Sequence, residues 1–236
     1  MAPKLFLFPI FLIIFSTACS QGFSSPTSHS SAWDGTDQPP DDEVSTPEGP
    51  IVEPPAALEK ARWEDVRGET SKQWTRHAYN ELEVHGLDML GKVPGDAEDF
   101  CPNYVRLNRH QKKTFWVYLL SAVSQFESNF NPDTSYTEAF ADSTGQMVVS
   151  RGLLQLSLES ARGYGCELRG GQDLHDPLKN LSCGIRILNR WVGSDGVIRA
   201  NNGGWKGGAR YWSVLRREAQ YGSIRGWTSS LKFCVK

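Results

Sequence analysis

The sequence predicts a mainly α-helical domain with one small β hairpin, preceded by a leader and a linker. Apolar side chains recur at helical spacing in several segments of residues 57–236, only one segment is strand-like, and residues 20–56 lack the apolar content of a folded unit. The chain has 236 residues, of which 39% are apolar and 22% are charged. This is enough for one packed domain with appendages, and it excludes a fully disordered protein or a polytopic membrane protein.

The leader, residues 1–19, resembles an export signal. Lys4 supplies a positive end, and the apolar stretch over residues 5–15 is too short to span a bilayer. Cys19 follows Thr-Ala, as in a bacterial lipobox whose thiol is diacylated, although Ser16 stands where Leu is usual. We therefore expect an exported, periplasmic lipoprotein held to the membrane by a lipid on Cys19, with secretion after ordinary cleavage as the alternative. Ser20 rather than Asp follows the cysteine, which favours the outer membrane.

The linker, residues 20–56, is rich in Ser, Pro, Thr and acidic residues, so the sequence predicts a disordered tether. From Leu58 onward the chain holds 24 basic and 20 acidic side chains, a net charge of +4. A mildly cationic domain suits a polyanionic partner without requiring one. The sequence contains no phosphate-binding glycine loop and no nucleic-acid motif, so we expect no nucleic-acid partner and no cofactor.

The cysteines predict disulfides. Once Cys19 is set aside, four cysteines remain, an even number in an oxidising compartment, and their spacing matches no zinc motif. We expect two disulfides and no metal. Of the three possible connectivities we favour Cys166 with Cys183, which closes a short loop, and Cys101 with Cys234, which fastens the C-terminus to the domain.

The first predicted helix of the domain follows residue 70. Trp74, Ala78 and Leu82 recur at four-residue spacing, and Thr70 with Gln73 has the pattern of a capping box. The pattern ends at a cluster of Gly and Pro before residue 96.

The strongest helix is predicted over residues 108–128. Two adjacent stripes of it are apolar, formed by Phe115, Leu119, Ala122 and Phe126 and by Trp116, Leu120 and Val123. A helix this apolar belongs in the core.

Three further elements follow this helix. Residues 137–149 are strand-like, and Ser143-Thr144-Gly145 predicts the turn of a hairpin. Asp176 followed by Pro177 supplies an N-cap and a first helical residue for a helix that runs to Gly193. Residues 208–219 form one more candidate helix.

Glu127 is the most informative residue. It lies four residues after Val123 and seven after Leu120, so helical geometry places its carboxylate on an apolar face. Pro132 ends the helix just afterwards, so Glu127 lies in the last turn, where the helix dipole and partial desolvation raise the pKa of a carboxyl group. A carboxylic acid that stays protonated near neutral pH can serve as a general acid. A satisfied ion pair, or a helix-end side chain reaching water, is the alternative.

Three motifs in order resemble the lytic transglycosylase domain of the soluble type, which is related to goose-type lysozyme. They are Glu127-Ser128-Asn129-Phe130-Asn131-Pro132, Gly152-Leu153-Leu154-Gln155-Leu156, and Asp176-Pro177 with Asn180 and Gly184-Ile185. The resemblance covers roughly residues 105–215. It implies a lysozyme-like α+β fold, with Glu127 as the catalytic acid beside a sugar cleft. The candidate substrate-binding residues are Ser150, Leu153, Gln155, Tyr164, Asn202 and Tyr211.

The resemblance also implies a reaction, cleavage of the β-1,4 bond between N-acetylmuramic acid and N-acetylglucosamine in peptidoglycan. In that family one glutamate protonates the leaving oxygen and then acts as base, while the substrate's own N-acetyl group or C6 hydroxyl attacks and leaves a 1,6-anhydro sugar. Attack by water instead leaves a reducing end, which is the reaction of a lysozyme (muramidase). Glu138 and Asp142, in the predicted hairpin, are the nearby acids that could supply a second carboxylate, with solvated turn acids as the alternative. A glutamate without a compelling second carboxylate favours the intramolecular route.

Two departures from the family pattern keep alternatives open. The stretch between Glu127 and Gly152 is longer than usual, and Asn201 stands where the family usually has a tyrosine beside the acid, a place that Tyr211 or Tyr164 could take. Hydrolysis, and action on N-deacetylated glycan, are therefore alternatives. A non-catalytic peptidoglycan-binding lipoprotein is the alternative from another class. In each case we expect a monomer that binds peptidoglycan glycan strands.

Overall fold

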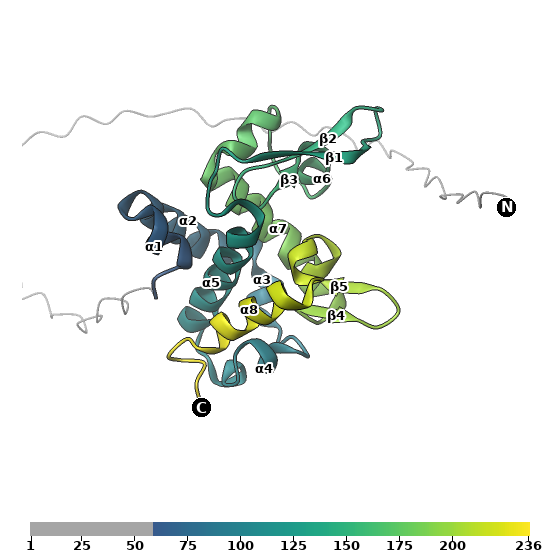
Figure 1. Cartoon of the computed structure of the whole chain (residues 1–236). Coiled ribbons are helices and arrows are strands. Elements are labelled where there is room, and N and C mark those ends of the chain that lie inside the picture. The colour runs from purple at the N-terminus through teal and green to yellow at the C-terminus, as the bar shows by residue number, and fades with distance from the viewer. Residues whose placement is uncertain (1–58) are drawn as a thin grey trace, which may run out of the picture. The chain divides into compact units, whose positions relative to one another are not determined.

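The computed structural model describes residues 59–236, and Figure 1 shows the order of their elements. The helices are α1 (Arg62–Arg67), α2 (Glu69–His85), α3 (Leu87–Gly91), α4 (Ala97–Phe100), α5 (Arg109–Ser128), α6 (Leu158–Gly163), α7 (Pro177–Asp195) and α8 (Glu218–Ser229). The strands are β1 (Ser135–Ala141), β2 (Met147–Arg151), β3 (Leu156–Ser157), β4 (Arg199–Asn201) and β5 (Trp205–Gly207). Short 3-10 turns are η1 (Tyr104–Arg106), η2 (Gly171–His175), η3 (Gly208–Arg210) and η4 (Ser213–Leu215). The prediction of a mainly α domain is confirmed, whereas the leader with Cys19 and the tether of residues 20–56 lie outside the described residues.

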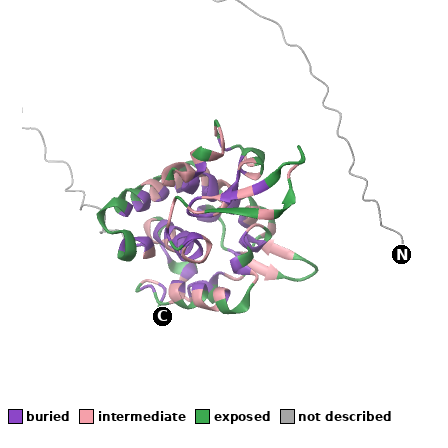
Figure 2. Cartoon of the chain, turned by 45° about the horizontal axis from the view of Figure 1, so that its top comes forward, coloured by how far each residue is buried: buried purple, intermediate pink, exposed green. Residues whose placement is uncertain are grey.

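Helix α5 is the central helix, as predicted. Its N-cap is Asn108, whose side chain accepts the Gln111 amide at 2.9 Å while the Gln111 side chain accepts the Asn108 amide at 3.0 Å. Its apolar stripes include Phe115 and Trp116, both fully buried. The helix packs against α1, α2, α3 and α8, which surround it in Figure 1. The burial pattern in Figure 2 shows the same core, with buried residues on the inward faces of the helices.

Helix α7 begins where the sequence predicts. The Asp176 carboxylate accepts the Leu178 amide at 2.9 Å, and Pro177 is the first helical residue. The helix runs two residues beyond Gly193 to Asp195, and its C-cap is Gly196, whose φ of 69° is in the left-handed region. It packs against α2 and α3.

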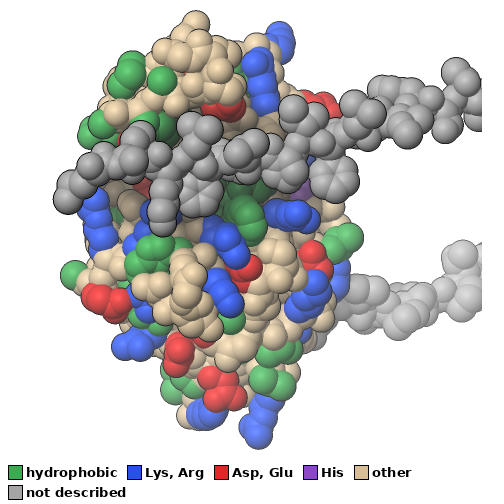
Figure 3. All heavy atoms as spheres, turned by 90° about the vertical axis from the view of Figure 1, so that its right-hand side faces the viewer, with side chains coloured by type: hydrophobic (Ala, Val, Ile, Leu, Met, Phe, Trp, Pro, Cys, Tyr) green, Lys and Arg blue, Asp and Glu red, His purple; other side chains and the backbone are tan. Residues whose placement is uncertain are grey.

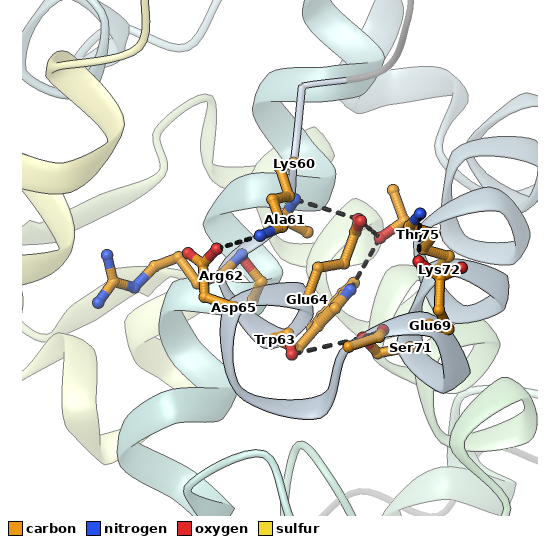
Figure 4. A network of polar contacts seen from close by, with 12 residues as sticks. Lys60, Ala61, Arg62, Trp63, Glu64, Asp65, Glu69, Ser71, Lys72 and Thr75 are labelled. Carbon is orange, nitrogen blue, oxygen red and sulfur yellow. Dashed lines mark hydrogen bonds and ion pairs between the residues drawn. The ribbon is translucent and has the colours of Figure 1, made fainter.

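A buried polar network joins α1 to α2 (Figure 4). The Trp63 indole donates to the Thr75 hydroxyl at 2.8 Å, and that hydroxyl donates to the Glu64 carboxylate, which also accepts the Ala61 amide at 3.3 Å. The predicted capping box at Thr70 was wrong. The turn of α1 into α2 makes Gly68 the N-cap, and the Thr70 hydroxyl donates to the Arg67 carbonyl instead.

The predicted hairpin is confirmed as β1 and β2, which pair antiparallel from Ser135 opposite Arg151 to Ala141 opposite Met147. The register shifts within β1, and β3 adds a third antiparallel strand beside β2. Figure 1 shows this hairpin projecting from the helices. A second two-stranded sheet, β4 with β5, was not predicted.

The helix predicted over residues 208–219 was wrong. This segment forms η3 and η4, and α8 begins only at Glu218. One tertiary and one local hydrogen bond explain the difference. The Trp212 indole donates to the distant Leu154 carbonyl at 3.0 Å, and the Arg216 side chain donates to the Ala209 carbonyl within the segment at 2.7 Å. These bonds hold the segment in an irregular path that a continuous helix could not follow.

Two disulfides are present, Cys101–Cys234 and Cys166–Cys183, which is the favoured connectivity. The first closes 133 residues and holds the C-terminal end beside the start of the α4 to α5 connection. Among residues 59–236, no helix is both long and apolar enough to cross a membrane.

Candidate functional site

Glu127 lines a cavity of about 390 Å³ between the β1–β2 hairpin and the segment before α8. It lies in the last turn of α5, and its side chain is partly exposed. Figure 3 views the side of the domain from which both hairpins project. The carboxyl group thus stands at the edge of the core, where a helix end meets an open cavity.

The electrostatic surroundings of Glu127 favour its protonated form. Burial raises the pKa of this carboxyl group to about 7, against 4.5 for an ordinary glutamate. The positive charge of Arg217 opposes this increase, and the negative charge of Glu138 adds to it. At neutral pH a large fraction of Glu127 therefore carries a proton that it can donate.

The backbone around this cavity is held in strained conformations. Asn129, Phe130 and Gln155 are the non-glycine residues with positive φ within the described part of the chain, at 50°, 61° and 47°. Asn129 is the left-handed cap of α5, while Phe130 is buried and bulky, a residue type that rarely adopts this conformation. Such strain persists only where packing enforces it, and here it clusters beside Glu127.

Hydrogen bonds fasten the end of α5 to the loop over residues 152–155. The Ser128 hydroxyl donates to the Leu153 carbonyl at 2.9 Å. The side-chain amide of Gln155 donates to the carbonyls of Thr134 and Gly152 at 3.1 and 2.9 Å. The loop therefore fixes both Gln155 and the helix turn that carries the candidate acid.

Asn180, on α7, supports the same loop from within the core. Its fully buried side chain accepts the Leu154 amide at 3.0 Å and donates to the carbonyls of Arg151 and Leu174 at 3.0 and 2.8 Å. Gly152 approaches so closely that a Cβ there would lie 2.0 Å from the Leu174 carbonyl oxygen, and its φ is 75°. The motif of residues 152–156 and the motif that begins at Asp176 are thus in direct contact through Asn180.

The hairpin forms one wall of the cavity. Glu138, on β1, accepts a hydrogen bond from the Ser150 hydroxyl on β2 at 2.7 Å, and both residues line the cavity. Phe140, two residues along the same strand, lines it too and is 60% exposed. An exposed aromatic ring beside two carboxylates can stack on a sugar ring.

Tyr211 lies in the opposite wall with Trp212 and Arg216. Burial raises the pKa of the Tyr211 hydroxyl to about 12, so this hydroxyl remains protonated at neutral pH. The Arg216 guanidinium is held by the carbonyls of Ala209 and Arg210, both at 2.7 Å. The wall is therefore rigid and offers donors to a polar ligand.

The structure brings together five of the residues singled out from the sequence. Glu127, Glu138, Ser150, Gln155 and Tyr211 all line this cavity.

The other candidates lie elsewhere. Leu153 is fully buried in the core, so its side chain does not reach the cavity, and only its backbone supports the site. Asn202 is exposed in the turn between β4 and β5, away from the lining residues. Tyr164 lines a neighbouring cavity instead. Asp142 organises the hairpin turn, where one carboxylate oxygen accepts the amides of Thr144 and Gln146 at 2.9 and 3.0 Å, so it is a turn acid.

Sequence reasoning missed several lining residues, namely Phe140, Ser157, Ser160, Ser213 and Arg216. Phe140 had a usable signal, since it shares a strand face with Glu138 at a spacing of two. The sequence carried no signal for Arg216, because the position of this residue depends on the irregular path of residues 208–217. Within residues 59–236, no three His, Cys, Asp or Glu side chains gather in a way that could hold a metal ion.

Comparison with known proteins agrees with this architecture. The model of the transglycosylase SLT domain matches residues 106–206. The solved structure of Bd0314 DslA wild-type form 2 is 49% identical, with a TM-score of 0.72, over 75% of this chain and 98% of that one. Structures of two Glu-to-Gln mutants of Bd0314 DslA are each 48% identical over 74% of this chain and 97% of theirs, with TM-scores of 0.71 and 0.72. None of the curated proteins compared with the chain matches it. The fold is lysozyme-like, and the chain belongs to the transglycosylase SLT domain family.

Proposed function

We propose that this protein cleaves the glycan strand of peptidoglycan at the β-1,4 bond between N-acetylmuramic acid and N-acetylglucosamine, with Glu127 as the general acid. Membership of the SLT family supports peptidoglycan cleavage in general. The observation that carries the specific proposal is the pKa of about 7 at Glu127, in the wall of a 390 Å³ cavity. The protonated carboxyl group donates its proton to the glycosidic oxygen as the bond to the anomeric carbon breaks.

For the second step we favour hydrolysis, because the structure supplies a second carboxylate. The sequence favoured intramolecular attack on the premise that no such group stood near Glu127, yet Glu138 lines the same cavity. Its negative charge can stabilise the oxocarbenium-like transition state or orient a water molecule. The water's hydroxyl then bonds to the anomeric carbon, and its proton returns to the Glu127 carboxylate. The product carries a reducing end, as in a lysozyme.

Two mutants of one relative support this assignment. The two Glu-to-Gln mutants of Bd0314 DslA change glutamates that are eleven positions apart in that chain. Glu127 and Glu138 are separated by the same eleven positions. The two glutamates that were mutated in that relative thus have the same spacing as Glu127 and Glu138, which line one cavity in this protein.

Intramolecular attack by the C6 hydroxyl, giving a 1,6-anhydro end, is the second candidate. The SLT family match favours it, since transglycosylation is what that family's description names. Asn201, at the position of the family tyrosine, is exposed in β4. Intramolecular attack therefore requires Tyr211 to take over the role of the family tyrosine.

Product analysis decides between these reactions. Purified sacculi are digested in H₂¹⁸O by the wild type, Glu127→Gln and Glu138→Gln, and the products are identified by mass spectrometry. We expect ¹⁸O at reducing muramic ends with the wild type, a loss of at least about 100-fold with Glu127→Gln, and a large loss with Glu138→Gln. Anhydro ends without ¹⁸O would establish transglycosylation. Full activity of a folded Glu127→Gln protein would contradict the acid assignment, and an inactive but binding wild type would favour a non-catalytic binding protein.

The acetylation state of the glycan is a second variable of the same assay. Besides Glu127, which is largely protonated at neutral pH, the charged residues lining the cavity are two carboxylates, Glu138 and Glu159, and one cation, Arg216. A glucosamine ammonium group therefore finds more negative than positive charge there. Digestion of matched acetylated and N-deacetylated sacculi measures the preference, and we expect faster cleavage of the deacetylated glycan.

We also propose that the enzyme works outside the cytoplasm, anchored in the outer membrane by a lipid on Cys19. The support is the signal-like leader in the sequence. Mass spectrometry of the mature N-terminus tests this, with a diacylated cysteine as the expected result. An unmodified N-terminus at another position would favour the secreted alternative.

A further inference from the structure

A second and larger cavity, of about 530 Å³, lies between α7 and the α2–α3 segment. Lys92, Arg186 and Arg190 line it, and Asp88 is the only carboxylate among its lining residues. Asp88 is already paired with Lys92 at 2.8 Å. The two arginines therefore leave this cavity with uncompensated positive charge.

Arg186 and Arg190 lie four residues apart on one face of α7, where like charges repel. Neither side chain forms an ion pair or a hydrogen bond with any residue of the described part of the chain, although eleven ion pairs exist there. The positive charge of Arg186 also lowers the pKa of His85, after the larger effect of burial. The repulsion between the two arginines destabilises the free protein, and a bound anion would relieve it.

The basic cavity adjoins the Glu127 cavity through a pair of tyrosines. Tyr164 lines the basic cavity, and its ring lies edge to face with Tyr211, with centroids 6.2 Å apart. Tyr211 lines the Glu127 cavity. The Trp191 indole donates to the Tyr164 hydroxyl at 2.7 Å and holds this ring in place. The two cavities therefore lie next to each other, on either side of this pair of tyrosines.

We propose that the basic cavity, with Arg186 and Arg190, binds the carboxylates of the stem peptide carried by the glycan strand that is cleaved at Glu127. This inference rests on the proposed function. A peptidoglycan strand carries peptides with free carboxylates beside its glycan backbone, and a guanidinium fork binds a carboxylate with two parallel hydrogen bonds. The substrate is then recognised at two places, its sugars near Glu127 and its peptide on α7.

The test compares two double variants, each in a Glu127→Gln background so that binding is measured without cleavage. Arg186→Gln with Arg190→Gln removes the proposed contacts. Arg76→Gln with Arg106→Gln removes the same charge from two exposed arginines that form no ion pair. The ligands are soluble glycan strands with stem peptides, the same strands stripped of peptides by an amidase, and peptide-bearing strands whose carboxylates have been converted to amides.

We expect the Arg186 and Arg190 variant to raise the Kd for peptide-bearing strands about tenfold, with no change for stripped or amidated strands. The control variant should leave all three constants unchanged. Thermal unfolding of the Arg186 and Arg190 variant should occur at the same temperature as the parent or higher, because a like-charge pair has been removed.

Three outcomes would overturn the inference. An equal loss on stripped strands would mean that the arginines bind the glycan itself, and an equal loss in the control variant would mean that only net charge matters. Binding to phosphatidylglycerol vesicles that is lost in the Arg186 and Arg190 variant, with strand binding unchanged, would assign the cavity to a lipid phosphate. Because the readout is binding, failure of the proposed cleavage reaction would appear separately, as an inactive wild type in the product assay.

Discussion

The ionisation of Glu127 connects the chemistry of single residues to the stability of the fold. A carboxyl group that remains protonated to about pH 7 is ready to act as an acid, but ionising it inside the cavity is unfavourable. Arg217 and Glu138 act on this equilibrium in opposite directions. These three residues therefore contribute to the pH dependence of both activity and stability.

The pH dependence of activity should move in opposite directions in two variants. As the general acid, Glu127 must be protonated, so kcat/KM should fall as pH rises through about 7. Glu138→Gln removes a charge that raises the Glu127 pKa and should shift this decline to lower pH, whereas Arg217→Gln should shift it to higher pH. If Glu138→Gln is too slow to assay, NMR titration of the Glu127 carboxyl carbon reports the same shift. Identical declines in all three proteins would show that another group titrates.

Glu127→Gln should stabilise the protein above neutral pH. The folded-state pKa of about 7 lies above the ordinary value of 4.5, so the folded state binds more protons between these values, and wild-type stability falls as pH rises through this window. The amide does not ionise, so the free energy of unfolding of the variant should exceed that of the wild type by about 2 kcal/mol at pH 8, allowing for partial exposure, and should match it near pH 4. Urea unfolding at both pH values measures this. A difference that does not change with pH would contradict the raised pKa.

The sequence was enough to predict the position of some residues of the site but not of others. Glu127 follows from helical spacing alone, because its helix is long, capped and apolar. Glu138 depends on hairpin register, which brings β1 beside β2 with a shift that no local pattern encodes. Leu153 was placed in the cleft because it lies in a motif beside Gln155, but Leu153 and its neighbour Leu154 are both fully buried in the core.

At the scale of elements, α7 holds the active-site loop through Asn180. The side chain makes three hydrogen bonds to backbone groups of two segments, all in the core. Gly184, also on α7, lets Leu154 approach, since a Cβ there would lie 2.2 Å from a Leu154 methyl group. The loop therefore depends on α7 for both polar and apolar contacts.

Asn180→Leu should destabilise the protein and impair activity together. The variant leaves a buried amide and two carbonyls without partners, which should cost about 3 kcal/mol or more. Asn202→Leu changes an exposed asparagine in the β4–β5 turn and serves as the matched control, with an expected effect within about 0.5 kcal/mol. Urea unfolding and the sacculus assay measure both effects. Loss of activity in Asn202→Leu at unchanged stability would restore Asn202 as a substrate-binding residue.

Elements with strong local signals were predicted, and those set by tertiary contacts were not. Caps at Asn108 and Asp176 mark the starts of α5 and α7 in the sequence, and Gly145 marks the turn of the hairpin. The start of α8 has no side-chain cap, and its preceding segment is held by bonds to distant residues, so helical spacing extended the helix too early. The cavity lies largely between well-predicted elements and this poorly predicted one. For that reason only part of its lining could be foreseen.

At the scale of the whole molecule, the two disulfides constrain the domain over different distances. Cys166–Cys183 joins the end of α6 to α7, 17 residues apart, whereas Cys101–Cys234 joins positions 133 residues apart. The second bond fixes the chain after α8, which packs on α4 and α5. The Cys101–Cys234 bond therefore holds the end of the chain that follows α8 to the segment between α4 and α5.

Removing each disulfide should have a different cost. By loop-closure entropy, Cys101→Ser with Cys234→Ser should lower the free energy of unfolding by about 5 kcal/mol, and Cys166→Ser with Cys183→Ser by about 3 kcal/mol. All four cysteines are buried, so the serine substitutions add similar desolvation costs and leave the order unchanged. Urea unfolding of both variants tests the order. Relative to the stability that it loses, the Cys166 and Cys183 variant should lose more activity than the Cys101 and Cys234 variant does. The reason is that Cys166 lies two residues from Tyr164, beside the proposed peptide site. A larger destabilisation from the short loop would show that native contacts, rather than closure of the long loop, dominate the contribution of these bonds.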